Sequence, residues 1–170
     1  LQWFRNQLAP GTAYDMLTAE AATAPPLSNG LYWLPYLMGE RTPHLDPYAR
    51  GGWIGLTNKH TRADLIRSII EGVSFSLRDC LTIIHEDMNL DIATVRASGG
   101  GAKAYGAALL ALAGVGPYDS VEAVCAKAIK EVSSVVPVPH ECAVYQRGYE
   151  VYGVLYPTLK PIYGLIHQMT

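Results

Sequence analysis

Three consecutive glycines, Gly99 to Gly101, follow a segment that is predicted to be a strand, Ile92 to Ala97. Glycine has no Cβ atom, so this backbone can bend sharply and can approach a ligand closely. A helix is predicted from Tyr105 to Val115, and the free N–H groups at its start favour phosphate or another polar ligand. The arrangement is typical of a nucleotide site, although a plain tight turn would use the same glycines.

The established phosphate-binding patterns are not matched in full. The sequence contains no Gly-x-x-x-x-Gly-Lys-Ser/Thr loop. The dinucleotide pattern Gly-x-Gly-x-x-Gly fails because Ala104 stands where a third glycine would follow Gly99 and Gly101. No acidic residue ends a following strand, so a nicotinamide-binding dehydrogenase domain is disfavoured.

A second group of residues that could do chemistry lies in the loop between Gly39 and Gly52. It consists of Glu40, Arg41, His44, Asp46 and Arg50. The histidine could act as an acid or base, but no second His or Cys stands at the spacing of a metal site. We favour loop bracing over direct catalysis, through ion pairs of Glu40 with Arg41 and of Asp46 with Arg50.

The elements that must position these loops are predicted from periodicity and turn residues. Short helices are expected before and after Pro10-Gly11, with the second from Tyr14 to Ala22. Apolar segments at 31–37 and 53–57 are predicted to be strands, and Pro35 places the first at a sheet edge or ends it. Strands that alternate with helices indicate an α/β fold class.

Two longer helices complete the prediction. Thr61 and Asp64 resemble a capping box, and apolar residues at helical spacing extend the helix to about Met88. Gly72 in its middle costs about 1 kcal/mol relative to Ala, so we expect something to pack closely against it. The last helix carries one stripe of tyrosines, which favours packing over ligand stacking. The stripe consists of Tyr145, Tyr149, Tyr152 and Tyr156.

Composition excludes several classes of protein. The 170 residues suit one domain with a hydrophobic core. The net charge of −2 does not indicate the basic surface with which proteins bind nucleic acid or an anionic membrane. The longest apolar run, 107–115, is too short to span a bilayer, and no secretion signal opens the chain. The three cysteines form neither a disulfide framework nor a metal site, which favours free thiols in a reducing cytosol.

The segment from Leu31 to Asp79, with Gly39-Glu-Arg-Thr-Pro-His44 inside it, strongly resembles the C-terminal half of FGGY-type sugar kinases. The later Ser98-Gly-Gly-Gly-Ala102 also matches that family, and the resemblance covers nearly the whole chain. Within the family the hexapeptide is most similar to that of xylulokinases, because glycerol kinases usually replace it and gluconate kinases vary the residues after Gly-Glu-Arg.

The resemblance implies a fold, a cofactor and a set of site residues. The fold would be an actin-like (ribonuclease H-like) ATPase domain with a mixed sheet flanked by helices. Residues 1–170 would form the C-terminal, nucleotide-binding domain of a two-domain kinase that uses ATP and Mg. The residues expected to contact the nucleotide are Gln2, Gly99, Gly100, Gly101 and Ala102.

Two departures from the family limit what this chain is expected to do. The catalytic Asp and the Asp-x-Gly-Thr turn of the family lie upstream of Leu1, so no residue here inherits the catalytic role and no metal ligand is assigned. The chain opens without Met, within a segment predicted to be a helix, so we expect it to be part of a longer protein and to be inactive by itself.

The second departure concerns residues 103–105. The family places another helix and strand between the glycines and the helix that begins at Tyr105, but here only Lys103 and Ala104 intervene. Either this segment has been deleted, or it is disordered and missing from the residues of this chain. We favour the second explanation, because a deletion would remove a buried strand and its covering helix.

The expected function is transfer of phosphate from ATP to a sugar hydroxyl, most specifically from D-xylulose to D-xylulose 5-phosphate. A kinase for gluconate, ribulose or glycerol, and a relative that binds nucleotide without catalysis, remain as alternatives. The sugar would bind through the missing N-terminal domain. We expect a cytoplasmic protein with no nucleic-acid or membrane partner. Its oligomeric state stays open, with a homodimer as one alternative.

Overall fold

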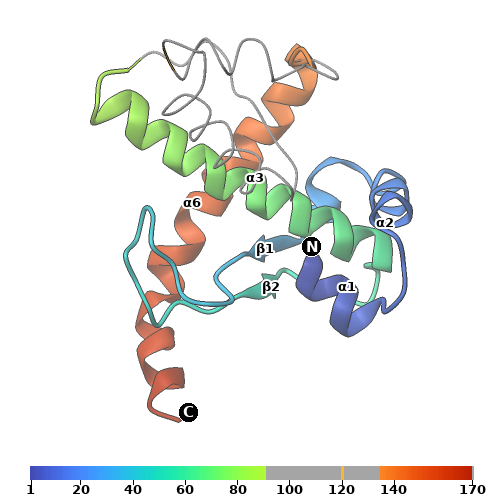
Figure 1. Ribbon diagram of the computed structural model, residues 1–170, viewed down its shortest axis with the longest axis horizontal. Coiled ribbons are helices and arrows are strands. Elements are labelled where there is room, and N and C mark those ends of the chain that lie inside the picture. The colour runs from blue at the N-terminus through green and yellow to red at the C-terminus, as the bar shows by residue number, and fades with distance from the viewer. Residues whose placement is uncertain (91–119, 121–134, 170) are drawn as a thin grey trace. The chain divides into compact units, whose positions relative to one another are not determined.

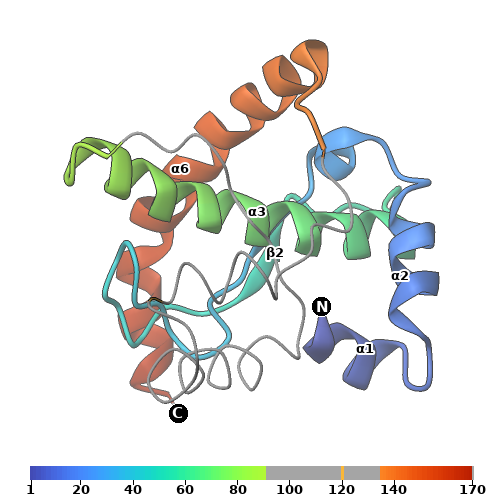
Figure 2. The same ribbon diagram turned by 45° about the horizontal axis from the view of Figure 1, so that its top comes forward.

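The computed structural model describes residues 1–90, 120 and 135–169. The chain divides into two compact units, one formed by Leu1–Asp91 with Pro137–Thr170 and the other by Ile92–Val136. The first unit contains every helix and strand of the described residues (Figures 1 and 2). The strand predicted at 92–97 and the helix predicted at 105–115 lie outside the described residues.

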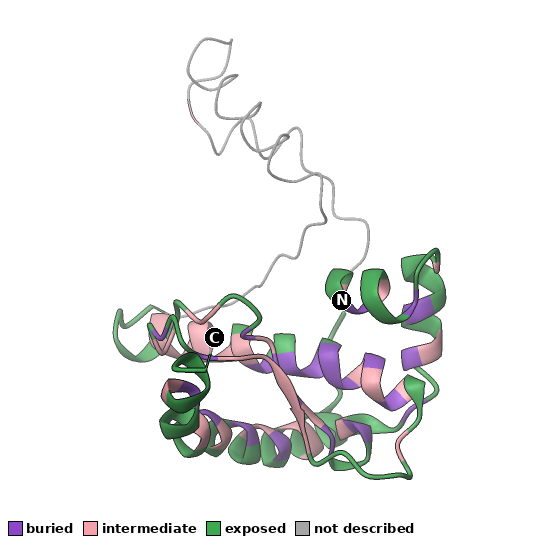
Figure 3. Ribbon diagram, turned by 90° about the horizontal axis from the view of Figure 1, so that it is seen from below, coloured by how far each residue is buried: buried purple, intermediate pink, exposed green. Residues whose placement is uncertain are grey.

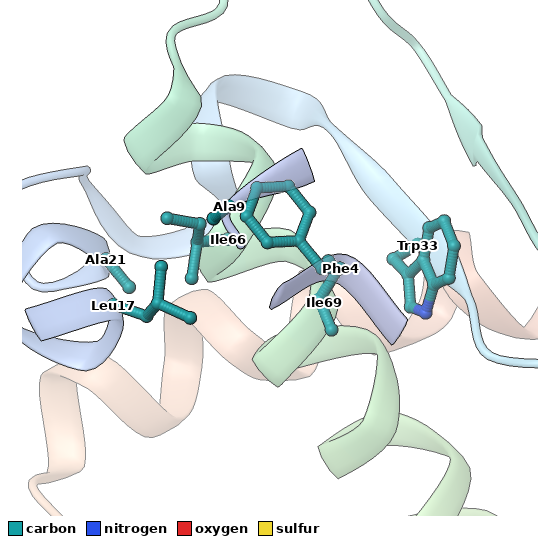
Figure 4. Packing of buried hydrophobic residues seen from close by; sticks show 7 residues of the cluster. All are labelled: Phe4, Ala9, Leu17, Ala21, Trp33, Ile66 and Ile69. Atoms are coloured by element: carbon teal, nitrogen blue, oxygen red, sulfur yellow. The ribbon is translucent and has the colours of Figure 1, made fainter. Parts of the chain in front are cut away.

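The N-terminal part consists of two short helices, as predicted. α1 spans Gln2–Leu8 and α2 spans Tyr14–Ala21, and Gly11 turns the chain between them with a φ of 79°. α2 packs against the long helix α3, Arg62–Glu86, and Phe4 of α1 completes the core shown in Figure 4. That core contains Phe4, Ala9, Leu17, Ala21, Trp33, Ile66 and Ile69.

The two predicted strands are present but shorter than expected. β1 spans Tyr32–Leu34 and β2 spans Gly52–Ile54, and they pair antiparallel with Trp33 opposite Trp53. Pro35 follows β1 directly and has no N–H to continue the ladder, which explains the early end. Of the predicted mixed sheet, the described residues contain this antiparallel pair.

The three tryptophans of the chain form one cluster beside this pair. The Trp33 and Trp53 ring centroids lie 4.5 Å apart, and Trp3 of α1 stacks on Trp33 at 5.8 Å. The indole N–H of Trp53 donates to the Ser68 hydroxyl at 3.0 Å, so its polar atom is satisfied. Aromatic stacking of this kind fixes α1 against the strands.

α3 spans Arg62–Glu86 and begins with the predicted capping box. The Thr61 hydroxyl accepts from the Asp64 N–H, and the Asp64 carboxylate accepts from the Thr61 N–H at 2.8 Å. The apolar face is buried only in part: Ile66 is fully buried, whereas Leu77 is 60% exposed. Figure 3 shows the buried positions gathered where the elements of this unit face one another.

Gly72 packs closely against the chain, which confirms the prediction for this residue. A Cβ atom at Gly72 would lie 2.1 Å from the carbonyl oxygen of Trp33 in β1. Only a residue without a side chain allows α3 to lie this close to the strand, so the cost of a helical glycine is offset by packing.

α6 spans Pro139–His167 and crosses α3 (Figures 1 and 2). Its predicted tyrosine stripe is a packing stripe. Tyr152 and Tyr156 are buried, and they pack with Phe75 of α3 and with Leu34 and Tyr36 of the β1 segment. The second core of this unit is therefore aromatic.

A buried carboxylate holds the turn η1, Pro26–Gly30, to both long helices. Leu27, Ser28 and Asn29 have positive φ values of 62°, 48° and 56°, a conformation uncommon for residues other than glycine. Glu71 of α3 accepts from the Leu27 N–H at 2.9 Å and from the Ser28 hydroxyl at 2.6 Å. These bonds stabilise a backbone that would otherwise be unfavourable.

The same carboxylate reaches α6. Glu71 accepts from Arg67 Nε and from the Tyr145 hydroxyl, each at 2.9 Å, and Arg67 also donates to the Ala24 carbonyl at 2.7 Å. A buried charge is tolerated when it is paired and hydrogen-bonded. Glu71, only 8% exposed, meets that requirement.

Among the helices of the described residues, none has the length and apolar character to cross a membrane.

We predict that Gly72→Ala destabilises the protein by about 1–3 kcal/mol, because the new methyl group would overlap the Trp33 carbonyl. The matched control is Gly153→Ala in α6, where a Cβ would meet nothing within 4 Å. The control should be neutral or stabilise the protein by up to about 1 kcal/mol. Urea unfolding measures both, and equal stabilities of the two variants would contradict the close contact.

Candidate functional site

Of the five residues predicted to contact a nucleotide, the structure describes one. Gln2 is the first residue of α1; its side chain is exposed and makes no hydrogen bond to the described residues. Gly99, Gly100, Gly101 and Ala102 lie outside the described residues, and so do residues 103–105. Their role in binding stays a prediction.

The charged loop between the strands is rigidly built. Glu40 and Asp46 pair through their backbones, with two N–H to carbonyl bonds of 2.8 Å, and close the segment between them. The Glu40 carboxylate accepts from the His44 N–H at 3.1 Å. The loop therefore holds His44 in a fixed position.

Bracing is confirmed, but the predicted ion pairs are wrong. The ion pairs among the described residues join Arg62 to Glu20 and Arg67 to Glu71, not Glu40 to Arg41 or Asp46 to Arg50. The loop carboxylates accept instead from backbone N–H groups and a tyrosine. Arg50 donates to three backbone carbonyls, those of residues 47–49. Charges here close turns rather than pair with one another.

A buried tyrosine anchors this loop to α6. The Tyr156 hydroxyl donates to Asp46 at 2.8 Å, and its ring stacks on the His44 imidazole with 3.5 Å between centroids and 3° between planes. Burial and the bond to Asp46 raise the pKa of Tyr156 to about 12, so the hydroxyl remains a donor. Burial alone would raise the pKa of Asp46, but the donors around it hold that pKa below 3.8.

Beside this anchor lies an open pocket of about 210 Å³ between the loop, α3 and α6. Its walls combine titratable groups with aromatic rings. The lining residues are Pro43, His44, Asp79, Thr82, Ile83, Tyr149, Tyr152, Gly153 and Tyr156. The packing stripe predicted on the last helix therefore also supplies one wall of a cavity.

The pKa values of the carboxyl group and the imidazole of the pocket are shifted in opposite directions. Burial raises the pKa of the Asp79 carboxyl, and the hydrogen bond from the Tyr149 hydroxyl, at 2.5 Å, opposes this effect. Burial lowers the pKa of the His44 imidazole, and Glu40 is the main group that opposes it. In both groups, therefore, burial disfavours the charged form.

Sequence reasoning identified His44 but missed Asp79 and Gly153. A single carboxylate on a long amphipathic helix is usually solvated, so nothing distinguished Asp79 from other charges on α3. The one usable signal was Gly153 within a helical run, since glycine is unfavourable there. Within the part of the chain that the structure describes, no group of three or more His, Cys, Asp or Glu side chains could hold a metal ion.

We predict that Tyr156→Phe destabilises the protein at neutral pH by about 1.5–3 kcal/mol, because Asp46 loses a charge-assisted hydrogen bond. The pKa of Asp46 is lowered on folding, so its contribution is present above 3.8 and is lost as the pH falls through the folded value. The difference between variant and parent should therefore shrink in acid.

Chemical denaturation across the acid range measures this effect. Tyr14→Phe is the control, because Tyr14 is 40% exposed and its hydroxyl makes no hydrogen bond to the described residues. A Tyr156→Phe defect that does not change with pH would show that packing, not the carboxylate, accounts for the loss.

Comparison with known proteins places this architecture in a family. The model of the C-terminal domain of the FGGY family of carbohydrate kinases matches residues 1–114. The chain is 31% identical over 187 residues to a xylulose kinase of Bacillus subtilis (strain 168), covering 95% of this chain and 37% of that protein.

Solved structures agree with this assignment. A xylulose kinase from Rhodospirillum rubrum has a TM-score of 0.74 and 28% identity, with 96% of this chain and 38% of that chain covered. A gluconate kinase from Lactobacillus acidophilus has a TM-score of 0.71 and 27% identity, covering 97% and 38%. This likeness confirms the predicted α/β, actin-like fold class, and the chain spans little more than a third of the length of these relatives. The chain belongs to the FGGY family of carbohydrate kinases and matches the C-terminal domain of its members.

Proposed function

We propose that the protein containing this chain transfers the γ-phosphoryl group of Mg-ATP to a hydroxyl of D-xylulose. In this proposal the chain supplies the nucleotide-binding half of a cytoplasmic enzyme. The observation that carries it is the 31% identity to a xylulose kinase over 95% of the chain, together with the family match. Phosphoryl transfer depends mainly on positioning and charge neutralisation, so a domain that orients the nucleotide contributes much of the rate.

The residues proposed for the nucleotide are Gln2 and the segment 99–102. The exposed amide of Gln2 fits this role, because it offers both a donor and an acceptor without breaking a hydrogen bond among the described residues. The three glycines would let the backbone lie flat against an adenosine moiety. We assign the catalytic base to a part of the protein outside this chain.

Two observations support testing other sugar substrates and testing whether the protein is a relative without catalytic activity. A gluconokinase of Bacillus subtilis and a glycerol kinase of Saccharolobus solfataricus also match, each over 61% of the chain. The alignment to the xylulose kinase runs over 187 positions, whereas 95% of 170 residues is about 161. About 26 positions of that alignment thus have no residue in this chain, which supports the absence of a segment that the relative possesses. Because the segment expected after the glycines belongs to the nucleotide site, a relative that has lost catalysis is also tested.

The first test measures turnover by the complete protein. We expect ADP release that requires both ATP and D-xylulose, with slower release when gluconate, ribulose or glycerol replaces the sugar. Faster turnover of another sugar would reassign the substrate within the family. ATP binding by calorimetry without turnover of any of these sugars would instead support the non-catalytic relative.

The second test concerns Gln2. We predict that Gln2→Ala raises the KM for ATP about fivefold and leaves the KM for the sugar unchanged. The loss of one hydrogen bond of about 1 kcal/mol accounts for a change of this size. Gln7→Ala is the matched control, because Gln7 is also exposed and lies on the same helix. Equal kinetic constants for the two variants would remove Gln2 from the nucleotide site.

A further inference from the structure

We propose that Asn29 is a site of self-modification: when the turn η1 opens, its side chain cyclises onto the nitrogen of Gly30 and loses its amide as ammonia. The folded turn protects Asn29 from this reaction. The carboxylate that forms does not fit beside Asp64, so each opening that leads to reaction becomes permanent. This proposal does not rest on the kinase activity.

The pair Asn29-Gly30 has the covalent chemistry that the reaction needs. The Gly30 nitrogen attacks Cγ of Asn29, so that an N–Cγ bond forms, the Cγ–Nδ2 bond breaks, and the proton of the nitrogen leaves with ammonia. Water then opens the cyclic imide at either carbonyl and yields aspartate or iso-aspartate. Asparagine is one of the thermolabile residues, and a following glycine has no Cβ atom to hinder the attack.

The surroundings leave room for the reaction and for water. Asn29 and Gly30 are both exposed, and a Cβ at Gly30 would meet nothing within 4 Å. The chain has three other asparagines, all exposed, and each precedes a residue with a long side chain. Asn6, Asn58 and Asn89 therefore serve as references within the same molecule.

The folded turn holds Asn29 in a conformation from which the imide ring cannot close. Its φ is 56° and its ψ is 30°. At this ψ the Cβ atom of an L-residue lies on the opposite side of the Cα–C bond from the following nitrogen, so Cγ is out of reach of the Gly30 nitrogen. Reaction requires rotation about that bond, and hence opening of η1.

Contacts from three sides resist this rotation. The Asn29 side-chain amide donates to Oδ1 of Asp64 at 2.8 Å, and the neighbouring Ser28 hydroxyl donates to the buried Glu71 at 2.6 Å. The imidazole of His60 contacts the Asn29 carbonyl oxygen through Nε2 at 3.4 Å. A local opening of this kind breaks few bonds, so each of them contributes measurably to how often the turn opens.

The product does not fit the closed turn because it brings two carboxylates together. Asp64 is 3% exposed and completes the capping box of α3. Burial raises the pKa of Asp64, but hydrogen bonds from Thr61 and Asn29 outweigh it and hold that pKa below 3.8, so Asp64 is ionised at neutral pH. Deamidation replaces the amide donor by a second carboxylate, and like charges this close repel. The iso-aspartyl product also lengthens the main chain by one carbon.

The first test follows all four asparagines by peptide mapping and mass spectrometry while the complete protein is incubated at mildly alkaline pH. In urea, Asn29 should convert at least about tenfold faster than the three reference asparagines, because it alone precedes glycine. In the folded protein, conversion of Asn29 should be at least about tenfold slower than in urea.

The second test changes the turn without changing the residues that react. Ser28→Ala removes the bond to Glu71 and should speed conversion of Asn29 in the folded protein about fivefold, the effect of one hydrogen bond on the population of the open turn. Ser74→Ala is the matched control, because the Ser74 hydroxyl donates to the Ile70 carbonyl within α3. The control should leave the rate unchanged.

The third test imitates the product. Asn29→Asp should lower the urea midpoint of the complete protein, because the new carboxylate faces Asp64. Asp64→Asn added to that variant should recover part of the loss, since an amide and a carboxylate then face each other in exchanged positions.

Four results would overturn the proposal. The first is conversion of Asn29 in urea that is no faster than conversion of the reference asparagines. The second is the same rate in the folded protein as in urea, and the third is the same rate in Ser28→Ala as in Ser74→Ala. The fourth is an Asn29→Asp variant as stable as the parent, because the product would then fit the closed turn.

Discussion

The described structure depends on one buried carboxylate. Glu71 accepts hydrogen bonds from the η1 backbone, from a neighbouring arginine on α3 and from a tyrosine on α6. Three segments far apart in the sequence therefore share one charge, and η1 or α6 cannot shift without removing a hydrogen bond from it. Breaking such a pair by removing one partner is far more costly than the pair is worth in isolation. The crossing of the two long helices, and with it the pocket between them, follows from this arrangement.

The loop between the strands repeats the same physical solution at the other end of the helix crossing. Asp46 is buried and takes its donors from its own loop and from Tyr156. Each carboxylate is anchored by a tyrosine of α6, so one helix face supplies both the apolar packing and the hydroxyl donors. This explains why α6 carries tyrosine at positions 145 and 156, where phenylalanine or leucine would fill the same space without donating a hydrogen bond.

Local signals in the sequence predicted the elements well, and long-range contacts explain where they failed. The capping box at Thr61, the turn at Gly11 and the close approach at Gly72 follow from chemistry within a few residues, and all are present. The ion pairs proposed in the loop are absent because the carboxylates found partners elsewhere. One is a tyrosine 110 residues away, which spacing along the chain cannot reveal. The pocket escaped prediction for the same reason, since its walls come from three separate segments. The nucleotide residues at 99–102 rest on the family resemblance alone.

The grouping of aromatic residues gives this domain two separate optical signals. All three tryptophans lie in the cluster that joins α1 to the strands, whereas the contact of α3 with α6 contains phenylalanine and tyrosines. Indole emission from this chain therefore monitors the seating of the helix that begins with Gln2. The cluster of described residues that joins α3 to α6 contains tyrosines and no tryptophan, so phenol absorbance reports more directly on the helix crossing.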